Sequence, residues 1–141
     1  MAEVKTLSKH PLGHEWTLWY FEVEVGQAWA DCLHEITSIN TVESFWVLQD
    51  NIKHPSDLKL GSDYAFFKVG IKPMWEDDLN KFGGRWILNV DKNSPISEVN
   101  SLWLDILLYL IGEKFASSHM ICGAVVSNRL RSFKIGESHS N

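Results

Sequence analysis

The stretch EVNSLWLDILLYLI, residues 98–111, shows the clearest helical spacing in the chain. Its apolar positions follow i, i+3, i+4 and i+7 steps, which is typical of one buried stripe on a helix. The stripe consists of Val99, Leu102, Trp103, Ile106, Leu107, Leu110 and Ile111. Ser97 is a suitable N-cap and Gly112 a suitable terminator. A helix with one long apolar stripe needs a flat partner, and a β-sheet is the usual one.

The segments around this helix supply the strands for such a sheet. Aromatic and β-branched residues predict strands at 15–25, 64–71, 85–91 and 121–131, and a short hairpin partner at 133–135. A second helix is predicted at 41–52, where Thr41 can cap the start and Val42, Phe45 and Trp46 are spaced i, i+3, i+4. The predicted fold class is therefore α+β, an antiparallel sheet with helices on one face.

Length and composition indicate one soluble domain. The chain has 141 residues, a net charge of −5 and seven tryptophans. The net negative charge disfavours non-specific electrostatic binding of nucleic acid, although a local anion-binding site can still exist. The two cysteines show no paired spacing, which favours a reduced, intracellular protein. The start MAEVKTLSKHP is no signal peptide, and the run 102–111 is too short to cross a bilayer.

An unusual pair, Trp75 followed by Glu76, occurs in the loop KPMWEDDLNKFGGRW at 72–86. A second tryptophan, Trp29, follows a glycine-containing turn after the first strand. If both loops open on the same side of the sheet, the two indoles can sandwich a base, and Glu76 can accept hydrogen bonds from a guanine edge. The alternative is that both tryptophans are half-buried anchors of their loops.

Basic residues cluster near the end of the sequence. Arg129 and Arg131 are two positions apart on a predicted strand, so they share a face, and Lys134 can return across a turn to join them. Arg85, after Gly83-Gly84, can add a fourth charge. Three or four cations at a strand end suit phosphate groups. The alternative, which spacing alone favours, is a solvated strand tip.

Leu104 and Leu108 lie on the side of the 98–111 helix that is opposite its core stripe. Together with Trp46 they can form an exposed apolar patch of the kind that marks a partner groove. The alternative is that they pack under a loop. The six histidines show no metal-ligand spacing, and no nucleophile motif or phosphate-cradling loop occurs, so neither an enzyme nor a cofactor site is predicted.

These segments together resemble the eukaryotic translation initiation factor 4E family, which binds the 7-methylguanosine cap of messenger RNA. The resemblance runs from about His10 to Ile135. It rests on the blocks HPL (10–12), WTLWYF (16–21), TVESFW (41–46), DYAFFKVGIKPMWED (63–77), GGRW (83–86), WLDILLYLIGE (103–113) and CGAVVSNR (122–129). The fold it implies is a curved antiparallel sheet with helices on the convex face and the cap on the concave side.

The resemblance also implies residue roles. Trp29 and Trp75 match the pair that sandwiches the methylated guanine, and Glu76 matches the carboxylate that reads its edge. The cap phosphates are assigned to Arg85, Arg129, Arg131 and Lys134. A convex docking surface for a short helical motif is assigned to His10, Pro11, Leu12, Val42, Trp46, Leu104, Asp105, Leu108, Ile111 and Gly112. Asp105 is one methylene shorter than the glutamate expected at its position.

The implied function is cap binding with recruitment of the scaffold initiation factor 4G, in the cytoplasm and also in the nucleus. Repressor proteins that use the same helical motif are further expected partners, and no membrane partner is expected. The alternative is a short form with impaired cap binding that docks scaffold or repressor proteins and so acts as a regulator.

The resemblance further implies that the last strands and helix of the family fold are missing. We expect a tail at 1–9, an incomplete cap-binding domain at 10–135 and a tail unlike the family at 136–141. On this expectation the strand 121–131 loses most of its hairpin partner and becomes an exposed edge carrying Val125 and Val126.

Overall fold

The computed structural model describes residues 9–73, 85–113 and 121–139 of the chain. The elements follow one another in the order β1 (Pro11–Phe21), η2 (Trp29–Cys32), β2 (Leu33–Thr41), α1 (Val42–Asn51), η3 (Pro55–Asp57), β3 (Asp63–Lys68), β4 (Arg85–Asp91), α3 (Ile96–Gly112), β5 (Ile121–Asn128) and β6 (Ser132–His139).

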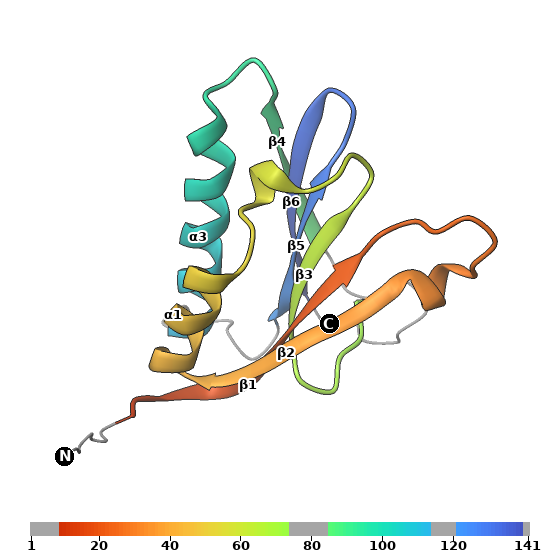
Figure 1. Cartoon of the computed structure of the whole chain (residues 1–141). Coiled ribbons are helices and arrows are strands. Elements are labelled where there is room, and N and C mark those ends of the chain that lie inside the picture. The colour runs from red at the N-terminus through yellow and green to blue at the C-terminus, as the bar shows by residue number, and fades with distance from the viewer. Residues whose placement is uncertain (1–8, 74–84, 114–120, 140–141) are drawn as a thin grey trace.

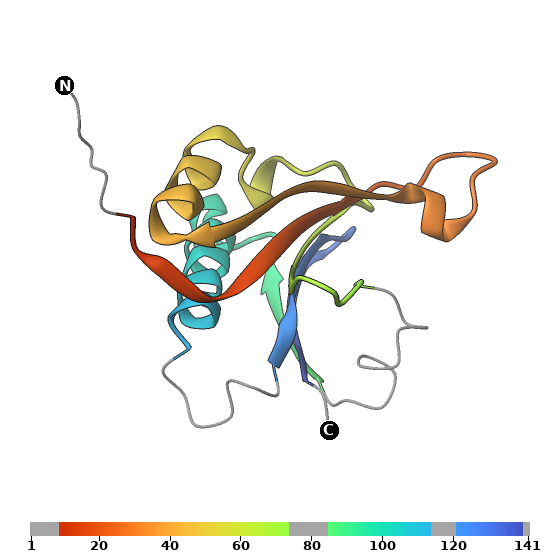
Figure 2. The same ribbon diagram turned by 90° about the horizontal axis from the view of Figure 1, so that it is seen from below.

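The strands form one curved sheet. Within the described residues it has six strands in the order β2-β1-β3-β5-β6-β4, and all neighbouring strands are antiparallel. Figures 1 and 2 show α1 and α3 side by side on the same face of this sheet, while the β1–β2 hairpin projects away from them. The predicted α+β class, with helices on the convex face, is confirmed.

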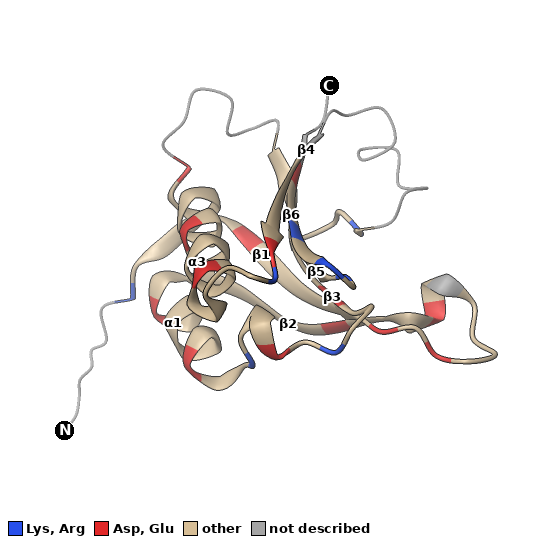
Figure 3. Ribbon diagram, turned by 90° about the horizontal axis from the view of Figure 1, so that it is seen from above, with Lys and Arg blue, Asp and Glu red and all other residues tan. Residues whose placement is uncertain are grey.

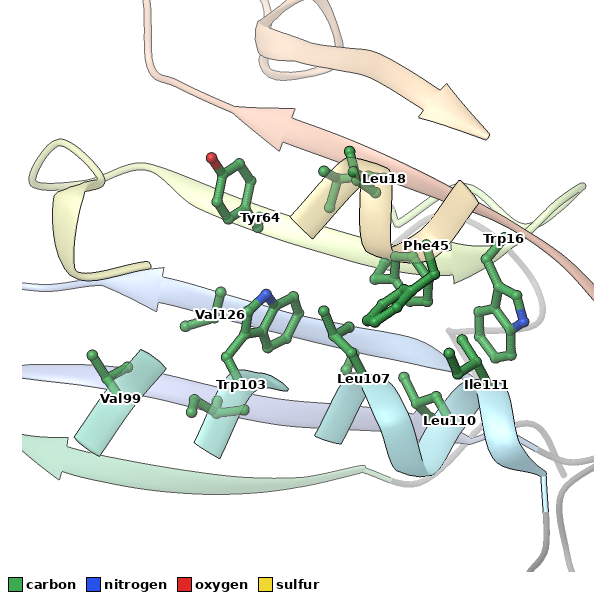
Figure 4. Packing of buried hydrophobic residues seen from close by; sticks show 14 of the residues in the cluster. Trp16, Leu18, Phe45, Tyr64, Val99, Trp103, Leu107, Leu110, Ile111 and Val126 are labelled. Atoms are coloured by element: carbon green, nitrogen blue, oxygen red, sulfur yellow. The ribbon is translucent and has the colours of Figure 1, made fainter. Parts of the chain in front are cut away.

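The core lies between the two helices and the sheet (Figure 4). Trp16 of β1 stacks on Phe66 of β3, with ring centroids 5.3 Å apart, and Phe45 of α1 meets Phe66 edge-on. From α3 the side chains of Val99, Trp103, Leu107, Leu110 and Ile111 are buried, as the predicted stripe requires. Leu102 and Ile106, at the margins of that stripe, are only partly buried. The stripe therefore packs on the sheet as predicted.

Both predicted ends of α3 are wrong by one or two residues. The N-cap is Pro95 and not Ser97, and the N–H of Glu98 donates to the carbonyl of Pro95 at 3.0 Å. The residue that ends the helix in the left-handed region is Glu113, with φ of 48°, and not Gly112. A left-handed conformation is uncommon outside glycine. Here a 2.6 Å hydrogen bond between the Glu113 carboxylate and the His14 ring holds the side chain against β1.

The strand predictions differ from the structure mainly at their ends. The 85–91 prediction coincides with β4, and the 64–71 strand is β3 with its end three residues earlier. The first strand begins and ends four residues before the predicted 15–25 range. No strand was predicted at β2, which pairs with β1 from Pro11↔Thr41 to Phe21↔Leu33.

The expected exposed edge at residues 121–131 is wrong. β5 lies inside the sheet and pairs with β3 on one side and β6 on the other. Val126 is fully buried and Val125 is partly buried, because β6 continues through residues 136–139 and does not stop near 135. The outer strand on this side of the sheet is β4, which pairs with β6.

The predicted cap of α1 is confirmed and gives a stability prediction. Thr41 Oγ1 accepts the N–H of Ser44 at 3.0 Å, and Ser44 Oγ accepts the N–H of Thr41 at 3.2 Å, which is a capping box. Thr41→Ala should therefore cost about 1 kcal/mol and lower the melting temperature by about 2–4 °C. Thermal unfolding checks this, with Thr41→Ser as the control. An equal loss in the serine variant would mean that the methyl group, not the cap, matters.

Candidate functional site

Two surfaces carry the residues that the sequence singled out. We call the sheet surface on the side away from the helices the sheet face. We call the exposed side of α1 and α3, together with the start of β1, the helix face. Figure 3 shows Lys and Arg on β6 and at the end of β5, whereas α1 and α3 carry Asp and Glu. The two surfaces therefore differ in charge.

The floor of the sheet face is apolar. Ala65 and Phe67 of β3 and Cys122 of β5 are buried there, and Trp19, Ile71 and Val125 pack around them. The period-2 alternation of residues 63–68 places Phe67 on this face and Phe66 in the main core. Sequence reasoning did not assign any of these floor residues to a site, although that alternation could have identified Phe67.

Lys134 stands at the basic end of the sheet face. It lies on β6 opposite Ser127 of β5 and Asn89 of β4. Its ammonium donates to Asn89 Oδ1 at 3.0 Å, and its side chain is exposed. Since an amide oxygen carries no charge, the positive charge of Lys134 stays available to an anion. Asn89, which orients the ammonium, was not predicted as a site residue.

Arg129 and Arg131 do not share a strand face as predicted, because β5 ends at Asn128 and both residues lie in the β5–β6 turn. Arg129 donates to Asp63 at the start of β3 through its two terminal nitrogens, from Nη1 at 2.8 Å and from Nη2 at 3.4 Å. Arg131 is exposed, and its carbonyl accepts the N–H of Lys92 at 3.3 Å. The turn therefore gathers cations at one end of the sheet, but Asp63 already neutralises one of them.

Arg85 is the first residue of β4 and pairs with Ser138 of β6. Strand alternation puts positions 85, 87 and 89 on the same face, and Asn89 is the position that contacts Lys134. Position 85 is four residues, roughly 13 Å, along the strand from Asn89. The backbone of Arg85 therefore lies well away from the basic residues near the β5–β6 turn.

The loop that carries Trp29 is held at its base. Trp29 opens η2, which follows a turn at Gly26 with φ of 83°. Cys32 is buried at the end of η2, where its carbonyl accepts the N–H of Glu22 at 3.2 Å and its Sγ accepts the N–H of Glu24 at 3.4 Å. These contacts hold the end of η2, the short helix that begins at Trp29, against the end of β1. Trp75 and Glu76 lie outside the described residues, so the predicted sandwich stays a prediction.

On the helix face, the first residues of β1 are tied to the start of α1. The N–H of Val42 donates to the carbonyl of His10 at 2.8 Å. Glu43 accepts the backbone N–H of His10 at 2.7 Å and contacts its ring Nδ1 at 2.6 Å. The predicted neighbours His10, Pro11, Leu12 and Val42 are thus brought to one corner of the helix face, with Leu12 partly packed on the core.

Next to this corner, exposed apolar side chains follow α1 and α3. Trp46 is 41% exposed and packs edge-on against the buried Phe45, and Leu108 of α3 is 37% exposed. Leu104 is half-buried, Asp105 and Gly112 are exposed, and Ile111 belongs to the core. Val47 and Tyr109, which sequence reasoning missed, are exposed on the same two helices. The face therefore presents an apolar surface with the acidic Asp105 beside it.

The His10–Glu43 contact gives a pH prediction. Hydrogen bonds from the backbone N–H and the ring of His10, and from the backbone N–H of Glu43 itself, lower the pKa of the Glu43 carboxyl from 4.5 to about 2. A lowered carboxyl pKa stabilises the folded state above the unfolded pKa and is lost as pH falls towards the folded pKa. The stability difference between wild type and Glu43→Gln should be complete above about pH 4.5 and vanish near pH 2. Urea unfolding across this range measures it, and a constant difference would contradict the assignment.

The described residues show two further absences. No three His, Cys, Asp or Glu side chains among them gather where they could hold a metal ion. None of the helices in this part of the chain is long and apolar enough to cross a membrane.

Comparisons with known proteins agree on one family. A family model described as Eukaryotic initiation factor 4E matches residues 11–137. Eukaryotic translation initiation factor 4E1 of Drosophila melanogaster is 54% identical over 92% of this chain and 49% of its own length. The human factor 4E type 1B is 49% identical over 94% of this chain and 55% of its own length. The chain spans about half the length of the curated relatives it matches.

Solved structures show the same similarity in three dimensions. Ascaris suum eIF4E-3 in complex with an m7G cap superposes with a TM-score of 0.92 at 42% identity, covering 95% of this chain and 75% of that one. Caenorhabditis elegans eIF4E-3, bound to the 4E-binding protein Mextli and a cap analog, gives a TM-score of 0.89 at 40% identity, covering 95% of this chain and 76% of that one.

Proposed function

The chain belongs to the eukaryotic initiation factor 4E family, and from this membership we propose that it binds the 7-methylguanosine 5′ cap of messenger RNA and recruits the scaffold initiation factor 4G to start translation. The observation that carries the proposal is the close superposition of this chain on a relative solved with a cap. The proposed place of action is the cytoplasm and also the nucleus.

For the base, Trp29 and Trp75 supply the two stacking surfaces and Glu76 the hydrogen-bond acceptor. Each stack is worth roughly 1–3 kcal/mol, and the positive charge of the methylated ring adds a cation–π attraction of roughly 0.5–2 kcal/mol. For the phosphates, the exposed Lys134 and Arg131 are the available cations at the basic end of the sheet face, and Arg85 is a further candidate. Arg129 can bind a phosphate as well only when its ion pair with Asp63 opens.

A tryptophan-fluorescence titration with 7-methyl-GTP, and GTP as the control, tests cap binding. The seven tryptophans give a strong signal, and the emission maximum before ligand addition reports whether the indoles are buried. Saturable quenching by the methylated nucleotide alone supports the proposal. A native-like spectrum without quenching contradicts it.

For the scaffold, and for repressor proteins with the same motif, the helix face is the proposed binding surface. An amphipathic helix can lay its apolar side on Trp46, Leu104 and Leu108, and Asp105 can meet a basic residue at its rim. The helix face lies within the described residues, and hydrogen bonds to His10, just before β1, already hold the start of α1 in place. This preorganisation lowers the entropy that binding must overcome.

Trp46→Ala should weaken binding of a scaffold-derived helical peptide about 30-fold or more, because a central, exposed tryptophan commonly contributes 2 kcal/mol or more to an interface. Leu130→Ala is the matched control, since Leu130 is an exposed apolar residue of the β5–β6 turn and belongs to neither α1 nor α3. Isothermal titration calorimetry measures both affinities. Equal losses in the two variants would place the peptide elsewhere than on the helix face.

A second candidate is favoured by the Arg129–Asp63 pair. Asp63 holds the guanidinium through two hydrogen bonds, so a phosphate must compete with a carboxylate for it. In this candidate the chain binds cap weakly or not at all, and it occupies scaffold or repressor proteins through the helix face. Peptide binding without quenching by 7-methyl-GTP would establish this regulatory form in place of the first.

A further inference from the structure

The indole N–H of Trp103 is buried without a hydrogen-bond acceptor. Trp103 lies in the middle of α3 and is 2% exposed, and its Nε1 atom has no partner among the described residues. Figure 4 shows this nitrogen on the edge of the indole that is turned towards Tyr64. Because the large majority of buried side-chain polar atoms in native structures are hydrogen-bonded, an acceptor for this N–H is expected.

A small polar pocket adjoins Trp103 where α1, η3 and α3 meet. Besides Trp103, its walls include Gln49 near the end of α1, Lys53 and His54 in the segment between α1 and η3, and Asn100 of α3. The space within it is about 10 Å³, which is the lower limit for one water molecule. The pocket is therefore too small for a nucleotide or a peptide side chain, whereas its polar walls suit a water.

Among the polar side chains of this pocket, Gln49 is the best acceptor for a bound water. The Asn100 amide is engaged with Ser56, since its Oδ1 accepts the N–H of Ser56 at 3.0 Å and its Nδ2 donates to Ser56 Oγ at 2.9 Å. Lys53 and His54 are exposed, and an ammonium group cannot accept a hydrogen bond. Gln49 is half-buried, and its side-chain amide offers an acceptor oxygen.

We propose that this pocket binds one structural water, which accepts the N–H of Trp103 and donates to the amide oxygen of Gln49. The carbonyl oxygen of Lys53 accepts the hydroxyl of Tyr64 at 3.1 Å and has a second lone pair, which suits the other hydrogen of the water. Three such partners are typical of a buried water. The water thereby links the end of α1 to α3, the two helices of the helix face, and its binding is independent of the proposed cap site.

A high-resolution crystal structure of the full chain tests the site directly. Density for a water should lie about 2.7–3.2 Å from Trp103 Nε1 and within the same distance of Gln49 Oε1. In solution, the indole Hε1 resonance of Trp103 should show an NMR cross-peak to water, with the sign of a bound water and not of proton exchange. A protein acceptor bonded directly to Nε1, or the absence of both the density and the cross-peak, would overturn the proposal.

Gln49→Leu removes the amide at a similar side-chain volume and should weaken the water cross-peak of Trp103 roughly twofold or more. Asn51→Leu is the matched control, because Asn51 also lies at the end of α1 but its amide donates to the carbonyl of Val47 at 2.6 Å. It should leave the cross-peak unchanged. A cross-peak that Gln49→Leu leaves intact would contradict the proposed bridge, and so would an equal loss in both variants.

Discussion

Replacing Trp75 by alanine should weaken binding of 7-methyl-GTP by tenfold or more, to the point of abolishing it at the upper end of the expected range. The variant loses one of two stacking surfaces, worth roughly 1–3 kcal/mol, and the cation–π attraction on that side of the ring, worth roughly 0.5–2 kcal/mol. A combined loss of about 1.5–5 kcal/mol reduces affinity about 10- to 4,000-fold. Fluorescence quenching and calorimetry with the same nucleotide measure this loss.

Trp46→Ala is the matched control for that experiment, since it removes an indole from the helix face. It should leave cap affinity unchanged while it weakens peptide binding, and Trp75→Ala should do the reverse. This reciprocal result would separate the two surfaces. Unchanged cap affinity in Trp75→Ala would show that the sandwich assignment is wrong, whatever the effect on the peptide.

Replacing Gly123 by alanine should strongly destabilise the fold, although it adds only one methyl group. A Cβ at position 123 would overlap the Phe66 carbonyl oxygen and lie 2.7 Å from the Phe67 Cα. Both atoms are backbone atoms of β3, which pairs with β5 at Phe67↔Gly123, so neither can move without disturbing the ladder. We expect a loss of about 3 kcal/mol or more and a melting temperature lower by about 10 °C.

Gly112→Ala is the control for this prediction. Gly112 is an exposed helical residue, and a Cβ there would meet nothing within 4 Å. Because alanine favours the helix by about 1 kcal/mol over glycine, this variant should be as stable as wild type or more stable. If Gly123→Ala melted together with wild type, β3 and β5 would have to lie farther apart than the pairing at Phe67 allows.

The elements with a strong apolar period were predictable, and those without one were not. The stripe of α3 and the capped start of α1 gave both helices, and RWILNVD gave β4 to the residue. β2 was missed because it is an outer strand, in which only Ile39 is buried, so it shows no apolar alternation. The ends of α3 were missed because the Pro95 carbonyl replaces the expected side-chain cap, and Glu113, hydrogen-bonded to His14 of β1, replaces the expected glycine.

The types of residue in the candidate site could be predicted from the sequence, but their positions and contacts could not. The basic residues near the end of the sequence do gather, yet Arg129 and Arg131 lie in a turn, a difference of a few residues that strand periodicity cannot detect. The pairing of Arg129 with Asp63 joins positions that are 66 residues apart, and no local pattern predicts such a contact. The position of Phe67 on the sheet face could have been predicted from the period-2 alternation of residues 63–68.

The order of the sheet has a consequence for how the chain folds. β6 pairs with both β5 and β4, so among the described strands residues 85–91 pair with residues 132–139 alone. Contacts between such distant segments are slow to form, because a long loop must close first. During synthesis α1 and the β1–β2 hairpin can form early, whereas β4 must wait for β6 to leave the ribosome. The rate-limiting step of folding is therefore expected to be the docking of β6 between β5 and β4.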